Sequence, residues 1–135
     1  MLISEIINAA FRKIGVVADG QSATADEAAD ALEAFNLMVS AWLLDGIDVW
    51  RVPGNDPFAE VHDWHATDVF PLPPAFREGA VYLLAAKISP EFSLPPMFDE
   101  NAYRAKMRAA FVDIAESAMP SALVRGAVYP TWRVR

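Results

Sequence analysis

Apolar residues recur every three or four positions in four separate stretches of this chain, which predicts four amphipathic helices. Ser4 is expected to cap the first helix, which would run through Ile14 and stop at Gly15. Arg12 and Lys13 would lie in its last turn, where positive charge complements the helix dipole. The apolar face of this helix consists of Ile3, Ile6, Ile7, Ala10, Phe11 and Ile14.

The second stretch has the clearest start, because Thr24 and Glu27 have the spacing of a capping box. The predicted helix extends from about Ala25 to Leu44, and Asp45–Gly46 supplies its stop. Its apolar stripe predicts one long buried face. The stripe contains Ala28, Ala31, Leu32, Phe35, Met38, Val39, Trp42 and Leu43.

Two further helices are expected in the second half of the chain. Proline is tolerated at the first helical position, so Pro73–Pro74 predicts a helix from Ala75 to Ile88, which Pro90 ends. Its inner stripe is Val81, Leu84, Ala85 and Ile88, and alanines on its other faces predict packing against more than one neighbour. The last helix would run from about Asp99 to Met119, with an apolar side of Tyr103, Met107, Ala110, Phe111, Ile114 and Ala118.

Residues 47–73 lack helical periodicity and contain a turn-rich break at residues 53–57. The β-prone pieces Ile47 to Val52 and Ala66 to Leu72 predict either a small hairpin or a long loop. Large aromatic residues in this insertion have two interpretations: they contact a partner, or they fold back on the helices. These residues are Trp50, Phe58, Trp64 and Phe70.

Residues 120–135 have no helical stripe and are interpreted as an extended C-terminal arm. The fold class predicted is therefore mainly all-α, with a four-helix, bundle-like domain over residues 1–119, an insertion at 47–73 and the arm. Arginine, tyrosine and tryptophan are frequent interface hot spots, so the arm is the predicted site for a partner or a neighbouring subunit. Its candidate residues are Leu123, Val124, Arg125, Val128, Tyr129, Trp132, Arg133 and Arg135.

Charge is distributed unevenly along the 135 residues. The arm has three arginines and no acid, which leaves −10 on the rest of a chain whose net charge is −7. An acidic body disfavours general binding to nucleic acid, although arginines beside aromatic rings could stack on bases. Docking onto another protein or onto an identical chain explains the same residues.

The composition is apolar for one small domain, with 54% hydrophobic residues and a mean hydropathy of +0.20. One explanation is apolar surface that meets other chains, and the other is a dense alanine and leucine core in a monomer. No apolar run reaches the roughly 18 residues of a membrane span. We therefore expect a chain made in the cytoplasm with no membrane partner.

Candidate chemistry is sparse. His62, His65 and Asp68 are residue types that bind zinc, but they lie in a predicted loop without the helix of a zincin motif. Surface histidines in an acidic loop are the alternative. There is no cysteine, no Gly-x-Ser-x-Gly elbow and no phosphate-binding glycine loop, so we expect no cofactor and no enzymatic activity.

Three stretches, in order, resemble the tail accessory factors of short-tailed phages, also called packaged-DNA stabilisation proteins. Residues 9–16 (AAFRKIGV) are similar to that family's "ALRKLGV" helix. Residues 30–34 (DALEA) and 42–47 (WLLDGI) are similar to its "DLExM…W..DGI" helix and turn. Residues 72–76 (LPPAF) and 83–92 (LLAAKISPEF) are similar to its "LPP…NLA..IAPEY" helix. The last helix and the arm match only in kind.

This resemblance implies a structural virion protein, assembled in the host cytoplasm, that joins the head to the tail. It implies a twelve-fold ring of copies that binds the portal protein, seals the packaged DNA passing through its channel, and offers a platform to a downstream tail or nozzle protein. In such a ring, one face of each copy meets a different face of its neighbour. Two alternatives stay open: a head-completion or connector protein of a long-tailed phage, and a small metal-dependent hydrolase using the His62, His65 and Asp68 loop.

Overall fold

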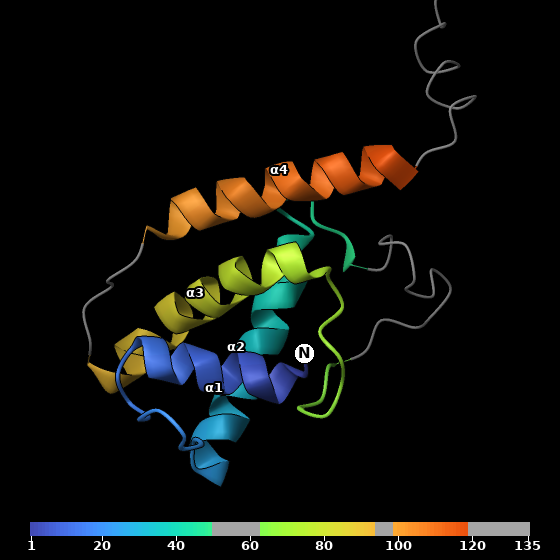
Figure 1. The fold of residues 1–135 in the computed structure, drawn as a ribbon. Helices are drawn as coiled ribbons and strands as arrows, with labels where there is room; N and C mark the ends of the chain where they lie inside the picture. The colour runs from blue at the N-terminus through green and yellow to red at the C-terminus, as the bar shows by residue number, and fades with distance from the viewer. Residues whose placement is uncertain (50–62, 94–98, 119–135) are drawn as a thin grey trace, which may run out of the picture.

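The computed structural model describes residues 1–49, 63–93 and 99–118, which form four α-helices (Figure 1). These are α1 (Ile3–Lys13), α2 (Ala25–Trp42), α3 (Arg77–Ile88) and α4 (Glu100–Ala118). Short 3-10 turns, η2 (Pro74–Phe76) and η3 (Ser89–Phe92), flank α3. Within these described ranges there is no β-strand, only one isolated bridge between Leu2 and Val69. The prediction of a mainly all-α protein is confirmed.

α1 begins two residues earlier than a cap at Ser4 would allow. Its N-cap is Leu2, whose backbone N–H donates to the Glu5 carboxylate at 2.6 Å. The Ser4 N–H instead donates to the carbonyl of Ala66 at 3.0 Å. The expected Ser4 cap is therefore wrong, because the Glu5 side chain binds the N-cap backbone at Leu2 and a distant segment binds the N–H groups of Ile3 and Ser4.

α2 has the capping box that the sequence predicts. The Thr24 hydroxyl accepts from the Glu27 N–H at 3.3 Å, and the Glu27 carboxylate accepts from the Thr24 N–H at 2.9 Å. The regular helix ends at Trp42, two residues before the expected Leu44, because the next turn tightens into shorter-range hydrogen bonds. Leu43 consequently leaves the buried stripe and is 53% exposed.

The turn after α2 is a Schellman motif that brings the chain back to the core. The Ile47 N–H donates to the Trp42 carbonyl at 2.8 Å, and the Gly46 N–H donates to the Leu43 carbonyl at 3.2 Å. Gly46 has a φ of +83°, a left-handed conformation that glycine adopts without strain. Ile47 is then fully buried, so Asp45 stays at the surface between two core residues.

α3 is the central helix, with contacts to α1, α2 and α4 (Figure 1). The stripe expected to face inward is buried, and Leu84, Ala85 and Ile88 are fully enclosed. The prediction that this alanine-rich helix packs against several neighbours is confirmed. The most enclosed large side chains in the core are Phe11, Phe35, Trp42, Phe76, Ile3, Ile6, Ile7, Ile47, Leu84 and Ile88.

α4 packs along α3 (Figure 1). Asp99 caps it, since its carboxylate accepts from the Ala102 N–H at 3.1 Å. Met107 and Phe111 are buried and Tyr103, Ala110 and Ile114 are half-buried, as predicted for its apolar side. The Tyr103 ring stacks on Tyr82 of α3, with centroids 4.7 Å apart and planes 12° apart.

The hairpin expected between residues 47–52 and 66–72 is not confirmed. Residues 66–70 instead run antiparallel to the start of the chain: Ile3 donates to the Asp68 carbonyl and Phe70 donates to the Met1 carbonyl, both at 2.9 Å. Residues 50–52 lie outside the described ranges. None of the described helices has the length and apolar composition needed to cross a lipid bilayer.

Candidate functional site

The residues predicted from sequence to contact partners fall in three places. All eight arm residues, together with Trp50 and Phe58 of the insertion, lie outside the described residues, so their predicted roles stay predictions. Trp64 and Phe70 are described, and the structure separates them. One lies beside the outer face of α2, and the other lies in the core.

Phe70 folds back on the helices. Its side chain is 5% exposed and makes edge-to-face contacts with Phe35 and Trp42, with ring centroids 6.4 Å and 6.5 Å apart. Aromatic pairs at these distances add roughly 0.5–1.5 kcal/mol to the energy of burial. Phe70 therefore attaches the segment after the insertion to α2, and its ring is not available at the surface.

The Asn36 side chain binds the backbone of Trp64 beside α2. The Asn36 side-chain oxygen accepts from the Trp64 N–H at 2.6 Å, and its amide nitrogen donates to the Trp64 carbonyl at 3.1 Å. The same amide also donates to the Leu32 carbonyl one turn earlier, at 3.2 Å. Because Asn36 satisfies both backbone groups of Trp64, residues 63–65 have a fixed position beside the helix.

A groove of about 490 Å³ lies between the outer face of α2 and residues 63–65. Leu32, Leu37 and Trp64 form its apolar wall, and Glu33 and Asp63 contribute acidic groups to its rim. Ala29, Asn36, Ser40 and His65 complete the lining. We call this the α2 groove. It is open and mixed in polarity, a shape suited to a peptide segment more than to an enclosed small molecule.

Leu37 stands on a ridge between the α2 groove and a second hollow of about 520 Å³. The second hollow is lined by Asp30, Glu33, Ala34, Leu37, Lys87 and Glu91. Leu37 is 58% exposed in this position. An exposed leucine with acidic hollows on both sides is the main apolar feature of the outer face of α2.

The segment that contains α2 has charges of one sign only. Between Ile14 and Trp50 the sequence has no lysine or arginine, and its acids are Asp19, Asp26, Glu27, Asp30, Glu33, Asp45 and Asp48. No ion pair of Asp30 or Glu33 is found in the part of the chain that the structure describes. The outer face of α2 therefore has negative charge available for a cationic partner.

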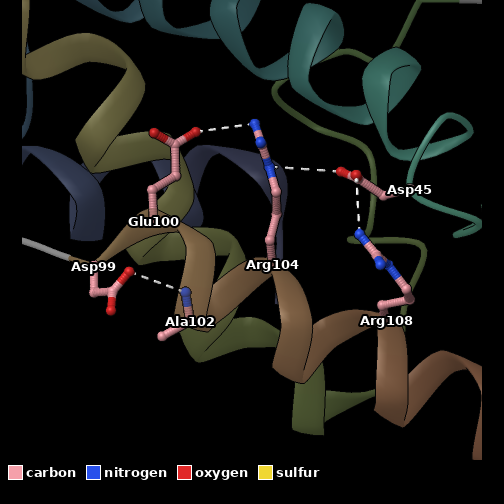
Figure 2. Close-up of polar contacts among 6 residues, drawn as sticks. All are labelled: Asp45, Asp99, Glu100, Ala102, Arg104 and Arg108. Atoms are coloured by element: carbon pink, nitrogen blue, oxygen red, sulfur yellow. Dashed lines mark hydrogen bonds and ion pairs between the residues drawn. The ribbon is translucent and has the colours of Figure 1, made fainter.

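Asp45, in the turn after α2, forms ion pairs with two arginines of α4, as Figure 2 shows. Its carboxylate lies 3.6 Å from Arg104 Nε and 3.5 Å from Arg108 Nη2. Glu100 approaches Arg104 at 3.1 Å and holds it from the other side. Asp45 is 20% exposed while the two arginines are 43% and 55% exposed, so this cluster is a surface clamp that ties α4 to the turn after α2.

A smaller hollow of about 160 Å³ lies between α3 and α4, and its lining includes Glu78, Tyr103 and Lys106. Partial burial raises the pKa of Tyr103 above its ordinary value, and the nearby Tyr82 and Glu78 raise it further. The phenol therefore keeps its proton at neutral pH.

The predicted zinc ligands are only partly described. His65 Nδ1 lies 3.5 Å from the Asp68 carboxylate, which also accepts from the His65 N–H at 2.7 Å. His62 lies outside the described residues. Within the described ranges, no three histidine, cysteine or acidic side chains gather closely enough to hold a metal ion. The His65 and Asp68 pair is accounted for by a turn, in which the Asp68 N–H donates to the His65 carbonyl at 3.0 Å.

No protein-family model matches this chain, and no curated protein or solved structure matches it either.

Proposed function

We propose that this chain is a structural virion protein, a head-to-tail adaptor whose copies form a ring under the portal of a phage. The observation that carries the proposal is a set of exposed leucines along α2 and its C-terminal turn. Leu37, Leu43 and Leu44 are 58%, 53% and 91% exposed. Large apolar side chains concentrated on one part of a small protein indicate a surface for another protein.

A second support is where the family-like stretches lie. Residues 9–16 lie at the end of α1, and residues 30–34 and 42–47 lie in α2 and its turn. Residues 72–76 and 83–92 lie in η2, the second half of α3 and η3. These three helices pack against one another. The resemblance therefore covers one continuous packing unit, which is what a shared fold would require.

In the proposed ring, the outer face of α2 meets a different face of the neighbouring copy. Such contacts are heterologous, and they form a ring when the rotation from copy to copy closes. Four helices form the body, the arm reaches the portal or an adjacent copy, and the insertion faces the tail side or the channel. The mechanism is assembly, with no substrate turned over. A connector of a long-tailed phage would use the same arrangement and would differ in the protein that follows it.

The test is the mass of the purified chain by light scattering, alone and with the portal protein encoded in the same genome. We expect the chain to join the portal in one complex containing many copies, and a ring to be visible by electron microscopy. Leu44→Glu should prevent ring closure, because it places charge in the contact, while the circular dichroism of the monomer stays unchanged. A chain that stays at 14.8 kDa and does not bind the portal contradicts the proposal.

A further inference from the structure

The α2 groove sets chemical requirements for whatever occupies it. Its wall of Leu32, Leu37 and Trp64 favours an aromatic or apolar side chain, and its acidic rim at Glu33 and Asp63 favours a cationic group. Arginine next to tyrosine or tryptophan meets both requirements, since its guanidinium pairs with carboxylates and packs on aromatic rings.

The chain itself contains such a segment at its C-terminus. Residues 128–135 have the sequence VYPTWRVR, in which Tyr129 and Trp132 alternate with apolar residues and two arginines. From Pro120 onward there are three arginines and no acid. The region from Ile14 to Trp50 has the opposite composition, with acids and no lysine or arginine. The two regions are therefore electrostatically complementary.

The length of the arm allows it to reach the groove of its own chain. Residues 119–127 link α4 to this segment and span up to about 30 Å when extended, at about 3.3 Å per residue. This is about the length of α4, which is about 28 Å at 1.5 Å per residue. A tethered segment that can reach its site has an effective concentration in about the millimolar range. At low protein concentration the segment therefore meets its own groove before that of another copy.

We propose that residues 128–135 dock in the α2 groove of their own chain in the free protein. The inference rests on the proposed function in one respect, which is the role of this docking. The arm covers the face of α2 that a neighbouring copy would contact, so the free monomer does not assemble. A portal that binds the arm uncovers α2 and starts ring formation.

Paramagnetic labelling of the full chain tests the docking directly. The sequence has no cysteine, so Thr131→Cys gives a single attachment site for a nitroxide. We expect the label to broaden the backbone amide signals of Leu37, Ser40 and Asp63 in dilute, monomeric protein. A label at Ala109→Cys, on the exposed side of α4, is the matched control and should leave these signals sharp.

Charge variants test whether the acidic rim holds the arm. Glu33→Gln should lower the ratio of docked to free arm by about two- to fivefold at low ionic strength, the range for one partly exposed ion pair. Asp19→Asn makes the same charge change outside the groove and should leave the ratio unchanged. Sodium chloride at about 1 M should release the arm of the unmodified chain, because it screens exposed charges.

Three results would overturn the proposal. The first is a Thr131 label that leaves the groove signals sharp. The second is broadening that appears only when labelled chains are mixed with unlabelled, isotope-enriched chains, since that would place the arm on a second copy. The third is equal loss of docking in Glu33→Gln and Asp19→Asn. Light scattering with the portal measures ring formation, and paramagnetic broadening measures docking of the arm. A negative result in either experiment therefore does not decide the other.

Discussion

At the residue scale, Gly79 sets how closely α3 and α4 approach each other. A Cβ atom placed there would lie 2.7 Å from both Cγ and Sδ of Met107, closer than such atoms pack. We expect Gly79→Ala to lower the free energy of unfolding by about 1–2 kcal/mol. The overpacking costs about 1–3 kcal/mol, which outweighs the roughly 0.5–1 kcal/mol that alanine contributes inside a helix.

The same substitution should have the opposite sign when Met107 is already shortened. In a Met107→Ala background the clash is gone and the helix propensity of alanine remains, so Gly79→Ala should raise stability. Urea denaturation of the four variants in this double-mutant cycle measures both effects. If Gly79→Ala stabilises the protein equally in both backgrounds, Met107 does not pack on Gly79 as the structure has it.

At the element scale, the first two helices start in different ways. Substitution of one hydroxyl-bearing residue near the start of each helix tests this difference. The Thr24 hydroxyl caps α2, so Thr24→Ala should lower the free energy of unfolding by about 1 kcal/mol. Ser4 lies inside α1 and its side chain makes no cap hydrogen bond, so Ser4→Ala should change stability by less than about 0.5 kcal/mol. Thermal or urea unfolding measures both, and equal losses would contradict this assignment.

These two helix starts also show what the sequence can and cannot predict. The capping box of α2 involves Thr24 and Glu27, three residues apart, and the pattern alone identified it. The start of α1 depends on Ala66, more than sixty residues away, which no local pattern reveals. The Schellman turn after α2 shows an intermediate case, because Gly46 predicted the stop while the tightening after Trp42 shortened the helix.

The clamp that joins α4 to the turn after α2 should be weak and sensitive to salt. Asp45→Asn removes the charge between Arg104 and Arg108, and we expect it to cost at most about 1 kcal/mol because both arginines are largely solvated. The cost should shrink in about 1 M sodium chloride. Asp19→Asn, which neutralises an exposed acid outside this cluster, is the control and should change stability by less than about 0.5 kcal/mol. A large, salt-independent effect of Asp45→Asn in urea unfolding would point to a different role for this carboxylate.

At the scale of the whole molecule, the charge asymmetry and the helix pattern were visible in the sequence, but the groove was not. The excess of acids before residue 50 and of arginines after residue 120 needs only counting. The groove depends on Asn36 binding the backbone of Trp64, 28 residues further along the chain. Asn36 has an ordinary position for a polar residue beside the buried stripe of α2, so its role becomes evident only when the helices are packed. Phe70 shows the same limit, because its pattern was equally consistent with a surface contact and with the core position it occupies.

The way the helices share the core predicts that the molecule opens in two stages. α1, α2 and α3 all contact one another, whereas α4 packs mainly on α3 through Met107, Phe111 and the Tyr82–Tyr103 stack. Local opening costs least where an element buries few apolar contacts, so amide hydrogens of α4 should exchange faster than those of α1 and α3.

Met107→Ala should lower the free energy of opening of α4 by the full effect of the lost packing, roughly 2–5 kcal/mol for a buried methionine. Exchange in α4 should therefore become faster, while exchange in α1 should change much less. Hydrogen exchange read by mass spectrometry or NMR measures this, with Phe11→Ala as the contrast, since that change in the shared core should speed exchange throughout. Equal acceleration of α1 and α4 by Met107→Ala would mean that all four helices open together, and that α4 has no independent freedom to rearrange during assembly.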